Sequence, residues 1–196
     1  MPRISAEREE ATRRSILRAA RNAFVVRGFH EATTHDVARE AGLSVGSIYT
    51  YFSSKDDLIH ESVLAANQEE TDAIIRDVQS TGTLREKLAR AIDGWYAYTL
   101  DAQLVPAFLA EAWAASTRKP LIRDLIARRH ERTVTVASMI IQEGVASGEL
   151  ASDLDVGAAA RAIAAMLDGI VLESIGSGAP PSRLEVRRRT ELIVGL

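Results

Sequence analysis

Apolar residues recur along the chain at intervals of three and four positions, the spacing of one face of an α-helix. The first helix expected spans residues 6–27 and ends at Gly28, because glycine readily adopts the conformation that closes a helix. Its apolar stripe consists of Ile16, Leu17, Ala20, Ala23 and Phe24. No convincing run of alternating, β-branched residues indicates a strand. The pattern therefore predicts an all-α protein.

Capping residues and helix breakers divide the remainder into further helices, about nine in all. Ser53, with Asp56 three residues later, is expected to cap a long helix that runs toward residue 78. Pro120 opens another long helix, which Gly148 closes. The other helices are expected at about residues 34–41, 45–51, 84–99, 106–116 and 156–177, and after Ser182.

Residues 33–52 carry the most specific pattern. Thr33 and Asp36 can form a capping box for one short helix, which a glycine ends, and a serine can cap the next. Ile48 anchors the second helix, whose outward residues are small. These outward residues are Val45, Gly46, Ser47 and Thr50. Such a surface suits a DNA major groove, where a large or acidic side chain would clash with base edges or repel phosphate.

The residues that follow strengthen this interpretation. The stretch YTYFSSKDDL at residues 49–58, with Gly28-Phe29 and residues 33–38, closely resembles the DNA-binding domain of TetR-family transcription regulators. The close resemblance covers about residues 12–60, and beyond it only helix lengths and short phrases match. It implies an N-terminal three-helix, helix-turn-helix DNA-binding domain at residues 1–54. A C-terminal antiparallel helical domain for ligand binding and dimerisation would then occupy residues 55–196.

The resemblance also implies roles for single residues. The expected DNA contacts are Thr33, Thr34, Ser44, Val45, Gly46, Ser47, Tyr49, Thr50, Tyr51 and Lys55. Among them, Tyr49 and Tyr51 would donate hydroxyl hydrogen bonds to phosphate, and Lys55 would add charge beside a helix N-terminus. The alternative is core packing for the tyrosines and a solvated surface charge for the lysine. Capping alone would explain Thr33 and Ser44.

Composition narrows the function classes. The chain has 196 residues, a net charge of −3 and no cysteine. Disulfides, thiolate metal sites and cysteine nucleophiles are therefore excluded. Residues 1–60 carry a net charge of +1 and residues 61–196 carry −4, so DNA affinity must come from locally placed groups. No apolar run approaches a membrane span and no signal peptide is evident, so a cytoplasmic location is expected.

No catalytic or metal-binding motif is found, so no enzyme activity and no cofactor are expected. The four histidines are not spaced as metal ligands. Aromatic and methionine side chains are spread over the helices expected between residues 84 and 177. Taken one at a time, each of them suggests core packing. The TetR resemblance implies instead that several of them line a small-molecule pocket. The expected pocket residues are Trp95, Tyr98, Phe108, Trp113, Met139 and Met166.

The helix at residues 156–177 is apolar on more than one face and so must be covered on both sides. The resemblance implies that the last two helices pair with those of a second copy. The expected interface residues are Ala160, Ile163, Leu167, Ile170, Val171, Leu184, Leu192 and Ile193. The alternative is that one chain covers this helix entirely.

The sequence thus predicts a homodimeric, sequence-specific DNA-binding transcription regulator, most simply a repressor that an unidentified small molecule releases from an inverted-repeat operator. Two other classes stay open. One is a ligand-independent DNA-binding or architectural protein, and the other is a helical enzyme that carries a similar helix pair.

Overall fold

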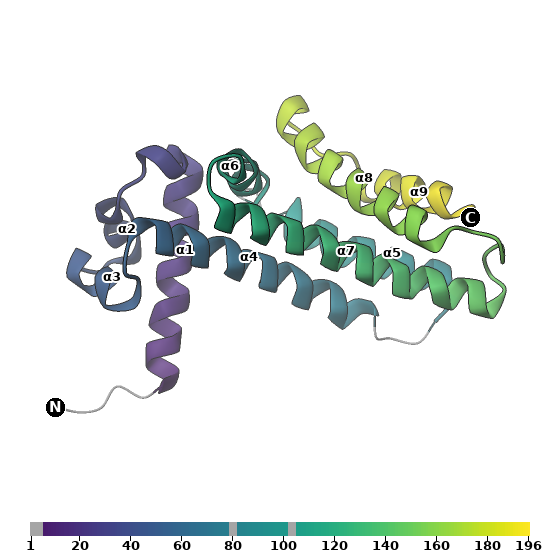
Figure 1. Ribbon diagram of the computed structural model, residues 1–196, viewed down its shortest axis with the longest axis horizontal. Helices are drawn as coiled ribbons and strands as arrows, with labels where there is room; N and C mark the ends of the chain where they lie inside the picture. The colour runs from purple at the N-terminus through teal and green to yellow at the C-terminus, as the bar shows by residue number, and fades with distance from the viewer. Residues whose placement is uncertain (1–5, 79–81, 102–104) are drawn as a thin grey trace. The chain divides into compact units, whose positions relative to one another are not determined.

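The computed structural model describes residues 6–78, 82–101 and 105–196, and every regular element within these ranges is an α-helix (Figure 1). The all-α expectation is confirmed. The helices are α1 (Ala6–Glu31), α2 (Thr34–Ala41), α3 (Val45–Tyr51), α4 (Lys55–Val78), α5 (Leu84–Thr99), α6 (Val105–Ser116), α7 (Pro120–Ser147), α8 (Val156–Ser177) and α9 (Arg183–Val194). Among the described residues, no helix is long and apolar enough to cross a bilayer.

Several helices begin at a residue whose side chain caps the first turn. These caps are Thr33, Thr83, Asp155 and Ser182. At the start of α5, Thr83 Oγ1 accepts a hydrogen bond from the backbone N–H of Glu86 at 3.3 Å, and the Glu86 carboxylate accepts one from the backbone N–H of Thr83 at 2.9 Å. Each cap satisfies backbone donors that the helix itself leaves unpaired.

Two helix ends differ from the expectation. α1 does not stop at Gly28: that residue breaks the helix with φ 73° and ψ 161°, and helical structure resumes as far as Glu31. The cap of α4 lies one residue later than expected. Ser54 Oγ accepts from the backbone N–H of Asp57 at 3.0 Å, and the Asp57 carboxylate accepts from the backbone N–H of Ser53 at 2.7 Å.

The chain forms two compact units, each assembled from two separate stretches of sequence. The first unit combines Met1–Ala66 with Ala107–Leu125, and the second combines Asn67–Pro106 with Ile126–Leu196. The long helices α4 and α7 each contribute their two ends to different units. The start of α4 and most of α6 therefore belong to the same unit as α2 and α3.

The core of the first unit contains three phenylalanine rings in edge-to-face contact. The ring of Phe29 lies 5.2 Å from that of Phe24 and 5.7 Å from that of Phe108 on α6. Beside them, a Glu111 carboxylate oxygen on α6 accepts a hydrogen bond from the backbone N–H of Phe29 at 3.0 Å. This bond satisfies a donor that the break at Gly28 frees from the helix.

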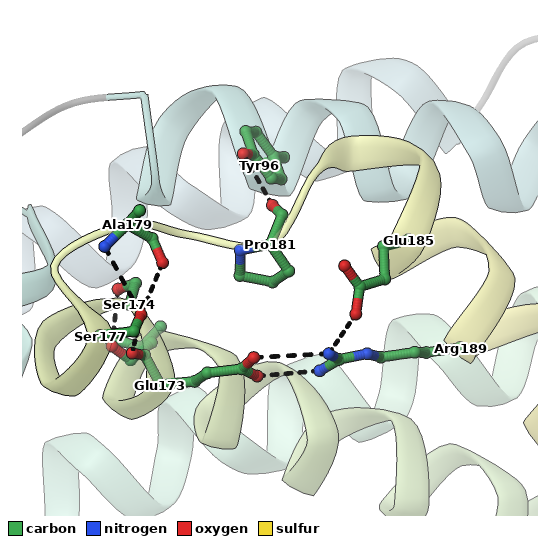
Figure 2. Close-up of polar contacts among 9 residues, drawn as sticks. Tyr96, Glu173, Ser174, Ser177, Ala179, Pro181, Glu185 and Arg189 are labelled. Atoms are coloured by element: carbon green, nitrogen blue, oxygen red, sulfur yellow. Dashed lines mark hydrogen bonds and ion pairs between the residues drawn. The ribbon is translucent and has the colours of Figure 1, made fainter.

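In the second unit, α9 packs against α5 and α8, and polar contacts secure the connection between α8 and α9 (Figures 1 and 2). The Tyr96 hydroxyl donates to the Pro181 carbonyl at 2.9 Å. The Arg189 guanidinium donates to both carboxylate oxygens of Glu173, at 2.9 and 3.4 Å. These bonds hold the pKa of Glu173 below its ordinary value and raise the pKa of Arg189. The register of α9 on α8 is thus fixed by a two-point contact.

Candidate functional sites

The helix pair α2–α3 is joined by a short turn whose geometry the sequence predicts. Gly42 adopts the left-handed conformation with φ 66°, and the backbone N–H of Leu43 donates to the Ala38 carbonyl at 2.9 Å. Val37 and Ile48 are buried, at 0% and 1% exposure. The inner faces of both helices are thereby fixed, which determines the residues that α3 presents outward.

The outer face of α3 is small and carries hydroxyl groups. Ser44 caps the helix by accepting from the backbone N–H of Ser47 at 3.1 Å, and the two side-chain oxygens lie 2.8 Å apart. Thr50 Oγ1 donates to the Gly46 carbonyl at 3.1 Å. Gly46 and Thr50 are exposed, while Val45 and Ser47 are half-buried. None of the four expected readout residues carries a charged side chain.

Two hydroxyls meet at the edge of this surface. Tyr49 on α3 is 51% exposed, and its hydroxyl lies 3.4 Å from Thr34 Oγ1 in the first turn of α2. Tyr51 is half-buried, with its ring 6.5 Å from that of the buried Phe52. The two tyrosines that the sequence singles out thus differ: Tyr49 presents its hydroxyl outward, whereas Tyr51 also serves packing.

Thr33 is engaged in capping. Its Oγ1 lies 2.7 Å from an Asp36 carboxylate oxygen, to which the hydroxyl donates, and it also accepts from the backbone N–H of Asp36. The hydrogen bonds from Thr33, aided by the nearby charges of Arg27 and Arg39, lower the pKa of Asp36 to about 2. The carboxylate is therefore ionised throughout the neutral range.

Lys55 has a structural contact that the sequence does not predict. Its Nζ donates to the backbone carbonyl of His30 at 2.6 Å. The two residues line an open cleft of about 300 Å³ together with Asp56, Glu111 and residues at the end of α6 and in the turn before α7. An ammonium group carries three N–H donors, so this contact leaves Lys55 able to bind a further acceptor.

A small apolar cavity lies in the second unit, among α5, α7, α8 and α9. Its lining residues are Leu88, Ala91, Ile92, Trp95, Thr133, Val136, Ala137, Ile140, Ile163, Leu167 and Thr190. Its volume is about 40 Å³. That is above the ~10–15 Å³ that one water molecule needs and below the roughly 300–1,000 Å³ of ordinary ligand pockets.

Only one of the six expected pocket residues lines this cavity, and that residue is Trp95. Phe108 is fully buried in the phenylalanine core of the first unit, and Trp113 belongs to the same unit. Met139 is 61% exposed on the outside of α7, Tyr98 donates its hydroxyl to Glu69 at 3.1 Å, and Met166 is half-buried. Phe108 and Met139 therefore lie away from this cavity, and the ligand pocket expected from the sequence stays a prediction.

The missed lining residues had a signal in the sequence. Leu88, Ala91 and Ile92 precede Trp95 by seven, four and three positions, so they share one face of α5. Aliphatic residues on the same helical face as a buried tryptophan identify the cavity wall better than aromatic content does.

Most of the residues expected at a dimer interface do not lie on the surface of the single chain. Ile163, Leu167, Ile170 and Val171 are buried within the single chain, as is Ala160, so they form its own core. The exposed small and apolar residues of α8 are instead Ala158, Ala162, Ala165, Gly169, Leu172, Ile175 and Gly176, with the charged Arg161 and Glu173 exposed among them. On α9, Leu184 and Leu192 are exposed, at 56% and 77%, while Ile193 is half-buried.

No cluster of histidine, aspartate or glutamate that would hold a metal ion occurs in the described part of the chain. His130 belongs to a polar group that joins two helices. Asp168 on α8 accepts from Arg129 Nη1 at 2.6 Å, and its other carboxylate oxygen lies 3.1 Å from His130 Nδ1. Arg129 is buried, at 3% exposure, so this group joins α7 to α8.

Known proteins share both halves of this architecture. Residues 16–62 match the family of bacterial regulatory proteins called tetR, and residues 84–192 match the C-terminal domain of BetI-type transcriptional repressors. The HTH-type transcriptional regulator BetI of Escherichia coli is 27% identical over 186 residues, which cover 92% of this chain and 89% of that protein. An uncharacterised HTH-type transcriptional regulator of Bacillus subtilis, YfiR, is 27% identical over 179 residues, which cover 89% of this chain and 85% of that protein.

Solved structures show the same fold. A transcriptional regulator from Saccharomonospora viridis in complex with choline superposes with a TM-score of 0.79 at 26% identity, covering 95% of this chain and 96% of that one. A TetR transcription regulator from Haloarcula marismortui superposes with a TM-score of 0.85 at 19% identity, covering 95% of this chain and 97% of that one.

Proposed function

Because the chain belongs to the TetR family of bacterial regulatory proteins, we propose that it represses transcription from an inverted-repeat operator and leaves that operator when a small molecule enters the cavity of its second unit. The chain is a DNA-binding transcription regulator with a BetI-type repressor domain. We propose which of its residues read DNA, where its ligand binds and which residues form the dimer contacts.

The observation that carries the proposal is the outer face of α3. Its inner face is fixed by Ile48, and its outer face offers Gly46, Ser47 and Thr50 without a bulky or acidic group. Base edges are read by such short side chains when a helix enters the major groove. Tyr49 and Thr34 stand beside this face as neutral donors for the DNA backbone.

We propose that a second copy of the chain covers the outward face of α8 and the exposed leucines of α9. Ala158, Ala162, Ala165 and Gly169 recur at alternating intervals of four and three, so two copies of α8 can approach closely along this line. Leu172 and Leu192 add apolar area on either side. A two-fold dimer presents two α3 helices to one operator, which explains an inverted repeat.

Release would follow from a difference in affinity between two states of the protein. A ligand that binds better to a widened cavity shifts the population toward that state. α7 contributes Thr133, Val136 and Ala137 to the cavity wall, and its first residues belong to the unit that contains the helix pair. A displacement of α7 would therefore connect the cavity wall, through one continuous helix, to the unit that contains α2 and α3.

The test is a selection from a randomised DNA library with the purified protein. We expect enrichment of an inverted repeat whose half-sites lie about one helical turn of roughly 34–36 Å apart, or a multiple of it. A parallel selection with a Gly46→Glu variant, which places an acidic group on the outer face of α3, should yield no enriched site. Failure of the parent protein to enrich any sequence would overturn the DNA-reading role of α3.

A further inference from the structure

The open cleft of the first unit lies where four segments meet: the end of α1, the start of α4, the end of α6 and the turn before α7. Its volume is about 300 Å³. That is the lower end of the roughly 300–1,000 Å³ of ordinary ligand pockets. The unit that contains the helix pair therefore has room for a small molecule outside the proposed DNA-reading face.

Charged side chains provide most of the polar groups in the lining of this cleft. Three are cations, from Lys55, Arg118 and Lys119, and two are carboxylates, from Asp56 and Glu111. With the lining histidine counted as neutral, the cleft carries an excess of one positive charge. Such a balance favours a ligand with a single negative charge.

Both carboxylates already have partners. Glu111 accepts from the backbone N–H of Phe29 at 3.0 Å, and both of its oxygens would lie within 3.4 Å of a Cβ atom at Gly28. Asp56 forms an ion pair with Lys119 across the cleft lining. A cationic ligand would have to displace these partners before it met a counter-charge.

The cations, in contrast, keep donors for an anion. Lys55 Nζ donates one of its three N–H groups to the His30 carbonyl at 2.6 Å, so two remain. Arg118 lies in the exposed turn after α6, and its guanidinium has no partner among the residues that the structure describes. The side chains of Lys119 and Asp56 are 37% and 72% exposed, and pairs so exposed add little to stability, so Lys119 can turn to a ligand.

The chemistry of the lining narrows the ligand further. A guanidinium presents parallel N–H donors that match the two oxygens of a carboxylate. Phe29, Ala114 and Ala115 supply apolar surface in the same cleft. A carboxylate attached to a compact apolar body would satisfy both parts of this lining.

We propose that this cleft binds a small organic monocarboxylate, which Arg118 and Lys55 hold by its carboxylate and Phe29 contacts by its apolar part. Lys55 is also the proposed phosphate contact, so the bound carboxylate competes with DNA for the same ammonium group and weakens operator binding. The competition rests on the proposed DNA-binding role of Lys55, whereas the anion site does not.

The test titrates the full chain with benzoate, with its neutral counterpart benzamide and with acetate, which lacks the ring. Sodium chloride keeps the ionic strength constant. Binding is measured by calorimetry and by the arginine Nε–H resonances of the ¹⁵N-labelled protein, in which the Arg118 signal is the one that an Arg118→Gln variant lacks. Arg128→Gln is the matched control, because it removes an exposed arginine of α7 that does not line the cleft.

We expect benzoate to bind at least about tenfold more tightly than benzamide, because its hydrogen bonds to the cations are charge-assisted. It should bind about three- to tenfold more tightly than acetate, because the ring buries apolar surface. Benzoate should move the Arg118 Nε–H resonance downfield. Arg118→Gln should lower benzoate affinity by about five- to tenfold, and Arg128→Gln should leave it unchanged.

The effect on DNA is measured separately, with the selected operator. Saturating benzoate should weaken operator binding by about five- to tenfold for each subunit that binds it, the effect of one lost phosphate contact. Without benzoate, Arg118→Gln should bind the operator like the parent.

Equal affinities for benzoate and benzamide would overturn the anion site. So would an unchanged Arg118 resonance, or equal benzoate affinities of the Arg118→Gln and Arg128→Gln variants. Weaker operator binding by Arg118→Gln without benzoate would assign Arg118 to a DNA phosphate and overturn its role in a ligand site. Bound benzoate that leaves operator affinity unchanged would overturn the competition. A chain that selects no operator fails the proposed function, while calorimetry still decides whether the anion site exists.

Discussion

The hydroxyl of Tyr49 on α3 lies 3.4 Å from the hydroxyl of Thr34 on α2. This separation exceeds the usual distance of about 2.5–3.0 Å between hydrogen-bonded hydroxyl oxygens, so the direct bond is weak. Both groups sit at the edge of the proposed DNA-reading face and both can donate. A phosphate oxygen placed between them would accept two hydrogen bonds without any change of backbone.

A Tyr49→Phe variant tests this arrangement. We expect its affinity for all DNA sequences to fall by about five- to tenfold, because one neutral hydrogen bond to a charged group is lost. The slope of affinity against salt concentration should stay unchanged, because no cation is removed. Tyr98→Phe, which removes a hydroxyl from the second unit, is the matched control and should leave DNA binding unaffected.

A Lys55→Gln variant separates its structural contact from its proposed phosphate contact. If Lys55 neutralises a phosphate, the salt slope should fall by about 0.9 per subunit. Loss of the bond to the His30 carbonyl should also lower the melting temperature. Lys87→Gln removes a charge from α5 in the second unit and serves as control. A lower melting temperature with the parental salt slope would assign Lys55 to structure alone.

Gly46→Ala should stabilise the protein and weaken operator binding. A Cβ atom at this position meets only Ser44 Oγ, at 3.8 Å, so the fold has room for it. Alanine in place of a helical glycine should raise the free energy of unfolding by about 0.5–1 kcal/mol. The added methyl group faces the proposed bases, so specific affinity should fall by roughly tenfold, the effect of losing one base contact. Parental operator affinity would mean that α3 does not approach DNA at Gly46.

The carboxylate of Asp36 should contribute to acid sensitivity. Its pKa is lowered to about 2 from a usual value near 3.8. A lowered pKa stabilises the fold above the unfolded-state pKa, and this contribution is lost as pH falls through the folded-state value. The parent should therefore lose more stability between about pH 4 and pH 2 than an Asp36→Asn variant does, as followed by thermal melts. Parallel curves for the two proteins would contradict the assigned capping contact.

The revised dimer surface gives a matched pair of variants. Leu172 on α8 and Met139 on α7 are similarly exposed in the single chain, at 56% and 61%. Leu172→Arg would bury an unpaired charge in the proposed interface and should yield monomers in sedimentation velocity. Met139→Arg should remain a dimer, because its face of α7 lies outside the proposed contact. A dimeric Leu172→Arg variant would show that α8 does not pair through this face.

The sequence alone determined the helices and the helix pair. Caps such as Thr33 and Thr83 and the turn at Gly42 depend on residues only three or four positions apart, so their effect is readable along the chain. The outward face of α3 follows from the buried position of Ile48 for the same reason. Periodicity likewise identified α8 as apolar on more than one side.

Only the tertiary structure decided what each apolar face meets. Periodicity places Phe108 and Trp95 on buried faces alike, yet Phe108 packs against Phe29 in one unit and Trp95 lines a cavity in the other. The same holds for Ile170, which its own chain covers, and for Lys55, whose ammonium group meets a carbonyl 25 positions away. Local hydrogen bonding fixes the direction of a side chain from its helix, whereas its partner is set by packing between segments far apart in sequence.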